Sequence, residues 1–337
     1  MDGMPDVADE VVRTAGRYDF ETFTVGVSLP EGLQEREDEL RSVLKIKGKE
    51  TAKAQAAHIA AEAVSKALGK EVDRFRPDLT LLVDLGRGSA AATSRPLYFY
   101  GRYSKPRGVP QRREFCANCS GSGCPKCRGT GFKRGPSVEL LVGKRLAKMT
   151  KSDRMRFTWM GSEDRGSRVR PPGRPFVVEV KSPVERRISS RFVARFGGGQ
   201  VSVSEGRVLP SKPLRLPSFK FRTRIVGTVR GDIDRSRLDE LEERFNASSV
   251  RFDRPDDKPT EKTVYRMSAR LRGKKLTIDA ELDGGLPVKR LVGGELVSPS
   301  VSEVLKAEVR CRTFDICGVE ETGEFEFAEV AWSQKKN

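Results

Sequence analysis

Residues 116–131 read CANCSGSGCPKCRGTG and hold four of the chain's six cysteines within twelve residues. The spacing is CxxC-x4-CxxC, formed by Cys116, Cys119, Cys124 and Cys127. Zinc prefers four tetrahedral thiolates, and the glycines between the pairs permit the tight turns that bring the sulfurs together. Four thiolates complete the coordination shell and leave no position for a reactive water. The sequence therefore predicts one structural Zn²⁺ and no catalytic metal.

The positive charge of the chain is concentrated around these cysteines. Residues 101–200 carry 24 Lys and Arg against 7 Asp and Glu, a net charge of +17, whereas residues 1–100 carry −3 and residues 201–337 carry +3. A thermophile-like surface would explain the 33% charged residues but not this segregation of sign. A local positive field attracts polyanions, and nucleic-acid phosphates are the commonest of these in the cytosol. We therefore expect a nucleic acid as the partner.

The chain is expected to be a soluble, cytoplasmic protein with no membrane partner. No apolar run approaches the ~20 residues of a membrane span. The acidic segment MDGMPDVADEVV lacks the layout of a signal peptide. In the reducing cytosol, clustered cysteines more often bind a metal than form disulfides.

The segment before the cysteines predicts a small α/β module that ends near residue 104. Residues 49–69 are Ala-rich and predict a helix closed by Gly69. Leu79–Asp84 predicts a buried strand, with Leu97–Tyr103 as its hairpin partner. His58 lies in the predicted helix and is the single histidine of the chain. Because there is only one, we expect no catalysis based on histidine.

The segment after the cysteines predicts a strand-rich α+β fold. Ser137–Lys148 predicts a helix with Ser137 as its N-cap, and Leu238–Phe245 predicts a second, short helix. Gly- and Pro-rich stretches separate the strand-like runs, which are Phe176–Val180, Arg191–Phe196, Arg224–Val229, Leu276–Leu282 and Glu308–Asp315.

Several blocks of the sequence together resemble the archaeal and eukaryotic tRNA pseudouridine-54/55 synthase family. GRYSKPRGVPQ, the four cysteines, GTGF and SVELL follow one another in the family's order. TWMGSEDRGSRVRPPGRPFVVEV and DGGLPVKRLVGGELVSPSVSEVLKAEVRCRTFDICGV are similar to two further blocks. The resemblance covers about residues 97–319. It implies an isomerase that converts uridines 54 and 55 in the T loop of tRNA to pseudouridine without a catalytic cofactor.

The resemblance also implies the site residues. In GSEDRGSR, Asp164 matches the family's nucleophile or base, and in LPVKRL, Lys289 matches its basic position. A cationic partner favours the ionised form of a carboxylate and orients it. A flipped uridine is commonly held by aromatic stacking, and Phe221 lies nearest the family's tyrosine. Arg168 and Arg174 are candidates for contacts with phosphate or with the aspartate.

Some positions depart from the family's pattern. Gly166 replaces its second aspartate and Pro287 replaces a tyrosine, which leaves open a lowered activity at one of the two uridines. Glu163 lies on the same turn as Asp164, and Glu163→Gln is expected to retain most activity.

Two domains are predicted, both within the α+β class. The resemblance implies that residues 1–135 form a THUMP-like RNA-binding domain with the four-cysteine zinc module, and that residues 136–337 form a mixed-sheet pseudouridine synthase catalytic domain. A structural accessory role for residues 1–100 stays open.

Two alternatives to the synthase remain. One is a non-catalytic, zinc-containing RNA-binding protein in which Asp164 is incidental. The other is a chaperone-like protein, because CANCSGSG and CPKCRGTG resemble the zinc repeats of DnaJ-type chaperones over about sixteen residues. The chain lacks the J domain of that family, and the charge segregation argues against it. A cleft that holds Asp164 beside Lys289 and an aromatic ring would favour the synthase.

Overall fold

A computed structural model describes residues 4–253 and 259–328, which fall into two compact units. The first comprises residues up to Leu97, Leu146–Met155 and Glu179–Ile188; the second comprises Tyr98–Arg145, Arg156–Val178 and the residues from Ser189 on. Both units combine helices with strands, which confirms the α+β class. The cysteine cluster lies in the second unit. The domain boundary between residues 135 and 136 stays a prediction.

The first unit is a four-stranded sheet in the order β2-β1-β3-β4 with helices on one face. Strands β2, β1 and β3 are parallel, and β4 is antiparallel to β3. The elements are α1 (Met4–Ala15), β1 (Thr22–Ser28), α2 (Leu33–Val43), α3 (Ala52–Leu68), β2 (Glu71–Val72), β3 (Leu79–Asp84) and β4 (Ser89–Ser94).

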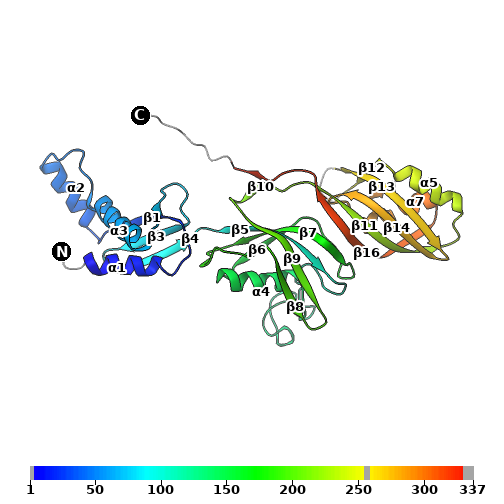
Figure 1. The fold of residues 1–337 in the computed structure, drawn as a ribbon, viewed down its shortest axis with the longest axis horizontal. Helices are drawn as coiled ribbons and strands as arrows, with labels where there is room; N and C mark the ends of the chain where they lie inside the picture. Colours follow the sequence, from blue (N-terminus) through cyan, green and yellow to red (C-terminus); the bar gives the residue numbers. More distant parts are fainter. Residues whose placement is uncertain (1–3, 254–258, 329–337) are drawn as a thin grey trace. The chain divides into compact units, whose positions relative to one another are not determined.

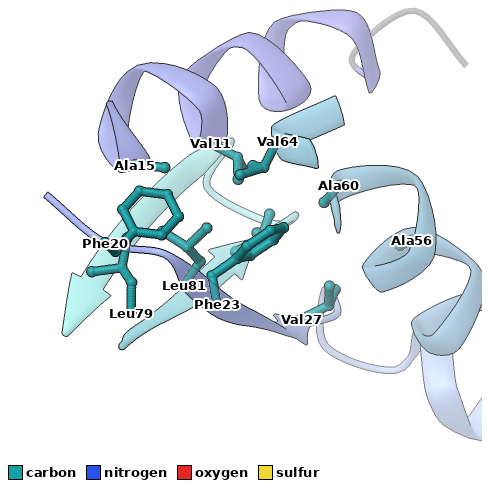
Figure 2. Packing of buried hydrophobic residues seen from close by; sticks show 11 residues of the cluster. Val11, Ala15, Phe20, Phe23, Val27, Ala56, Ala60, Val64, Leu79 and Leu81 are labelled. Atoms are coloured by element: carbon teal, nitrogen blue, oxygen red, sulfur yellow. The ribbon is translucent and has the colours of Figure 1, made fainter. Parts of the chain in front are cut away.

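The core of this unit follows from the alternation along its strands. Leu79 and Leu81 of β3 are fully buried, whereas Leu82, on the opposite face, is 54% exposed. Figure 2 shows Val11 of α1 and Val64 of α3 on the buried side of the sheet. One face of the sheet is thus covered by α1 and α3.

Helix α3 and strand β3 confirm two predictions, but the predicted hairpin is wrong. The hydroxyl of Thr51 caps α3 by accepting from the backbone N–H of Ala54, and Gly69 ends it in a left-handed conformation. The antiparallel partner of β3 is β4, and Leu97 begins a strand of the other sheet. β4 reads SAAATS, whose small residues carry little of the β-branched and aromatic signal that marks strands.

The second unit is built on an eleven-stranded mixed sheet, in the order β15-β12-β13-β14-β11-β16-β7-β5-β9-β8 with β6 beside β7 (Figure 1). Its strands are β5 (Leu97–Lys105), β6 (Met155–Trp159), β7 (Val169–Val180), β8 (Phe192–Phe196), β9 (Gly199–Leu209), β11 (Phe219–Arg230), β12 (Ser248–Phe252), β13 (Thr260–Arg272), β14 (Lys275–Asp283), β15 (Val297–Ser298) and β16 (Glu308–Glu321). A separate two-stranded sheet pairs β10 (Pro213–Arg215) with β17 (Glu326–Phe327).

Short helices complete the second unit and position part of the site. The 3-10 turn η1 (Pro125–Cys127) lies in the cysteine cluster. Helix α6 packs against β16, and α5 packs against β13 and α7. The bounds are α4 (Val138–Thr150), which runs into the first unit, α5 (Arg235–Phe245), α6 (Val288–Gly293) and α7 (Val301–Leu305).

The elements predicted after the cysteines are confirmed, although most are longer than predicted. Ser137 caps α4 by accepting from the backbone N–H of Leu140. The predicted short helix lies in α5, and the five predicted strand runs lie in β7, β8, β11, β14 and β16. Within residues 4–253 and 259–328, no helix is long and apolar enough to cross a membrane.

Candidate active site and cysteine cluster

Asp164 and Lys289 form an ion pair although 125 residues separate them in sequence. Asp164 lies in the loop of residues 160–168 between β6 and β7, and Lys289 lies in the first turn of α6. The Lys289 Nζ to Asp164 Oδ2 distance is 2.7 Å, and the side chains are 55% and 42% exposed. The carboxylate is therefore both paired and open to solvent.

The pair lines a cavity of about 810 Å³. Its walls are residues 161–164 of the loop, residues 285–290 at the start of α6, and the side chains of Arg112, Trp159, Arg174, Phe221 and Phe314. A volume of this size lies within the range of small-molecule binding sites, so a nucleoside can enter it. The walls offer charged groups and aromatic rings to one ligand.

Beside Asp164 in the loop, Glu163 points into the protein. Its side chain is fully buried and accepts from Arg174 Nη1 at 3.2 Å, from the Tyr103 hydroxyl at 2.6 Å and from Gln111 Nε2 at 3.2 Å. Burial, followed by the nearby Glu163 carboxylate, raises the pKa of Tyr103 well above its ordinary value. Glu163 is thus the buried anchor of the loop. A substitution at Glu163 should disturb the loop and cannot serve as a control for a substitution at Asp164.

The side chain of Arg174 also binds backbone carbonyls of the same loop. Its Nε donates to the carbonyl of Met160 and its Nη1 to the carbonyl of Ser162, both at 3.1 Å. Gly161 has a φ of +88°, and a Cβ there would lie 2.0 Å from Arg174 Nη2. Only glycine fits this close approach without a shift of the guanidinium. Arg174 is 3% exposed, and its hydrogen bonds go to residues 160–163 of the loop.

Two further groups hold the far side of the loop. Lys105, at the end of β5 and 3% exposed, donates from Nζ to the carbonyls of Asp164 at 3.2 Å and Ser167 at 2.6 Å. Burial lowers the pKa of Lys105 to about 8. Asp315 of β16 accepts from the backbone N–H of Arg168 at 3.0 Å and pairs with Arg107 at 2.7 Å. The backbone that presents Asp164 is therefore fixed from β5 and β16.

The structure gathers most of the predicted site residues in one place. Asp164, Lys289, Arg174 and Phe221 all line the cavity, whereas Arg168 is exposed and does not. The ring of Phe221 is 3% exposed and lies 5.9 Å from the Arg174 guanidinium carbon, so it forms part of the cavity wall. The sequence prediction did not include the anchors of the loop, which are Lys105, Arg107, Tyr103, Glu163 and Asp315.

The four clustered cysteines bring their sulfurs within 4.8 Å of one another, which could hold a metal ion. The Sγ–Sγ distances include 3.9 Å for Cys116 and Cys124, 3.8 Å for Cys119 and Cys127, and 3.7 Å for Cys124 and Cys127. A tetrahedron with metal–sulfur bonds of about 2.3 Å places its sulfurs about 3.8 Å apart. The donor set therefore fits a tetrahedral thiolate site.

Backbone donors favour a thiolate at this cluster. The N–H groups of Cys124 and Gly131 lie 3.1 and 3.3 Å from the sulfur of Cys127. Desolvation alone would raise the pKa of Cys127, but these donors, together with the side chains of Cys124 and Cys119, outweigh it and lower the pKa to about 6. Metal ligands must be deprotonated, so this environment suits a coordinating sulfur.

The chain matches known families along both units. The family model "Pus10 THUMP domain, archaeal" matches residues 7–84, and "Pus10, C-terminal" matches residues 98–206. The tRNA pseudouridine synthase Pus10 of Cenarchaeum symbiosum is 32% identical over 304 residues, which cover 89% of this chain and 74% of that protein. The protein of the same name from Nitrosopumilus maritimus is 30% identical over 312 residues, 92% of this chain and 81% of that protein.

These matches place the chain among the pseudouridine synthases, which are isomerases. Within that class, it belongs to the tRNA pseudouridine synthase Pus10 family, and its first unit contains a THUMP domain.

A solved Cbf5-Nop10-Gar1 complex is a much weaker match. Its TM-score is 0.35 at 9% identity, over 66% of this chain and 48% of that chain. A likeness at this level supports no statement about the site.

Proposed function

We propose that this chain converts uridines 54 and 55 of the tRNA T loop to pseudouridine, with Asp164 as the nucleophile or base. The observation that carries the proposal is the solvent-accessible Asp164–Lys289 pair within the 810 Å³ cavity. Among the alternatives, a non-catalytic RNA-binding protein has no need for a paired carboxylate in an open cavity with aromatic walls.

The chemistry is an isomerisation and needs no redox partner. The bond between C1′ and N1 breaks, a bond between C1′ and C5 forms, and the proton lost from C5 is balanced by one gained on N1. Asp164 attacks the nucleotide or takes a proton from it. Lys289 holds the carboxylate in position. Trp159, which is partly exposed, offers aromatic surface to a uridine that has left its stack, and Phe221, 3% exposed, contributes to the cavity wall.

The direct test is to incubate the protein with an unmodified tRNA transcript and to map every pseudouridine formed. Conversion at positions 54 and 55 is expected. Conversion at 55 alone would fit the departures at Gly166 and Pro287. A transcript that binds but gains no pseudouridine would favour the non-catalytic alternative.

Lys289→Met is expected to lower kcat by about 10- to 100-fold without abolishing the reaction. Loss of a group that directly stabilises the developing charge costs about 10²–10³-fold, and the loss here should be smaller because Lys289 orients Asp164 and is not the reacting group. Lys289→Arg keeps the charge and should restore most of the rate. Single-turnover rates with saturating tRNA measure the difference. Equal rates for wild type and Lys289→Met would show that the ion pair has no part in the reaction.

We also propose that the metal held by the cysteine cluster is one structural Zn²⁺ per chain. The fit of the sulfur distances to a tetrahedron supports this assignment. With four thiolates around it, the ion would fix the loop of residues 116–127 and take no part in the reaction.

Elemental analysis of the purified protein should find about one zinc per chain. Cys119→Ser should lower that content, because it removes one of four ligands. Cys311→Ser is the matched control, since Cys311 lies outside the cluster, and should keep its zinc. Wild-type protein with no zinc and four freely titrating thiols would contradict the assignment.

A further inference from the structure

A second cavity, of about 390 Å³, lies between the cysteine cluster and the start of α4. Its lining is strongly basic. Six cationic side chains face it, whereas Glu114 is the one acidic side chain in its lining. The cations are Arg113, Arg128, Lys133, Arg134, Lys144 and Arg165. The net charge of the lining is therefore +5.

The net charge of +5 already includes Glu114, whose carboxylate is shared between two of the six cations. Glu114 lies 3.3 Å from Lys133 Nζ and 3.7 Å from Arg165 Nη1. Arg113 stacks its guanidinium carbon 3.8 Å from the centre of the Phe132 ring. Like charges gathered around a concave surface raise the local concentration of anions. The cavity is thus suited to an anionic group.

We call the 390 Å³ cavity the basic cavity, and the 810 Å³ cavity that Asp164 and Lys289 line the catalytic cavity. Arg165 lines the basic cavity and Asp164 lines the catalytic cavity. Arg113 of the basic cavity likewise follows Arg112 of the catalytic cavity, so residues that are neighbours in the chain line the two cavities at two places. An RNA strand bound at Asp164 can therefore continue from one cavity toward the other.

An exposed aromatic ring stands at the same place. Phe115 is 66% exposed and stacks on Phe132, with the ring centres 5.4 Å apart and an angle of 15° between the planes. Phe132 itself lines the basic cavity. Sites for unpaired nucleic acid combine a positive groove for the backbone with aromatic rings for the bases. Both parts are present here.

We propose that the basic cavity and Phe115 form a subsite for the nucleotide next to the target uridine. The cavity binds the phosphate of that nucleotide, and Phe115 stacks on its base. The proposal rests on the proposed function in one respect, that the strand bound at Asp164 is RNA. It assigns to the cysteine cluster the task of shaping the subsite.

The test measures binding of an unmodified tRNA transcript to the full chain at several KCl concentrations. Arg134→Met with Lys144→Met should weaken binding and lower the slope of log K against log [KCl] by about 1, the loss of one phosphate contact. Phe115→Ala should weaken binding about tenfold at every salt concentration, with an unchanged slope, because stacking releases no counterions. Phe115→Tyr should bind like wild type.

The matched control removes two charges elsewhere in the same unit. Arg272→Met with Lys274→Met changes exposed side chains at the β13–β14 hairpin and should leave the slope close to that of wild type. An equal loss of slope in the control would show that the general positive field of the unit attracts the RNA, and it would contradict a local phosphate subsite. An unchanged slope for the Arg134 and Lys144 variant would overturn the phosphate assignment.

Binding and modification are scored separately, so the subsite and the proposed function can fail independently. Both salt series are repeated in the Asp164→Asn background, where binding does not depend on turnover. A protein that shows the slope change but forms no pseudouridine keeps the subsite and loses the proposed function. A protein that modifies tRNA with no slope change keeps the function and loses the subsite.

Discussion

Asp164→Asn should abolish pseudouridine formation, by at least about 10³-fold, while tRNA binding and folding persist. Asparagine has nearly the size of aspartate but neither its charge nor its basicity. The side chain is 42% exposed, so the amide can be solvated, and Lys289, 55% exposed, can turn to water when it loses its partner. Exposed ion pairs contribute little to stability. Single-turnover assays, tRNA binding and thermal unfolding together measure the three properties.

The matched control is Asp239→Asn, the same chemical change at an exposed position on α5. It should retain the wild-type rate. A near wild-type rate for Asp164→Asn would remove Asp164 from the reaction. A rate lost together with the folded state would show only a structural role for the loop.

Glu163→Gln should lower the free energy of unfolding by about 3–5 kcal/mol. The substitution leaves the guanidinium of Arg174 buried without its charged partner, and breaking a buried pair in this way costs far more than the pair contributes. It also weakens the bond from the Tyr103 hydroxyl, which donates to the Glu163 carboxylate at 2.6 Å. Denaturant titration of the purified variant measures the loss. The expectation from sequence, that Glu163→Gln retains most activity, does not fit a fully buried carboxylate that anchors the loop carrying Asp164.

A double variant separates charge from packing. Glu163→Gln combined with Arg174→Met removes both charges, so the loss should be smaller than for Glu163→Gln alone. Ser162→Ala, an exposed position in the same loop, is the control and should stay within about 0.5 kcal/mol of wild type. A loss for Glu163→Gln no larger than that of the control would contradict a buried ion pair.

Short-range sequence signals and the family resemblance are enough to predict part of the fold and of the candidate site. The four cysteines are recognisable because metal ligation demands a fixed local spacing, and α3 is recognisable because it is Ala-rich and Gly69 marks its end. The placement of Asp164 beside Lys289 agrees with the resemblance, because both residues lie in blocks that resemble the family. These features depend on few residues at a time.

The anchors of the loop depend on sheet register, which the local pattern does not contain. Lys105 reaches Asp164 and Ser167 because β5 lies beside β7, the strand that follows the loop, and Asp315 reaches Arg168 because β16 pairs with the start of β7. A basic residue in a strand pattern is ordinarily exposed. Its burial follows from contacts between segments far apart in the chain.

The position of β16 has a consequence for how the chain is synthesised. Every other strand of the large sheet precedes β16 in the chain, yet β16 lies between β11 and β7. Until residues 308–321 have been made, the edge of β11 that pairs with β16 is unpaired, and unpaired edges are prone to pairing with other chains. β7 is less affected, because it meets β16 only through Val169 and Ile316 and also pairs with β6. Asp315 is part of β16, so the loop of residues 160–168 gains its bond to Asp315 only after β16 has been synthesised. A nascent chain that stops before residue 308 should therefore need a chaperone's protection and have no synthase activity.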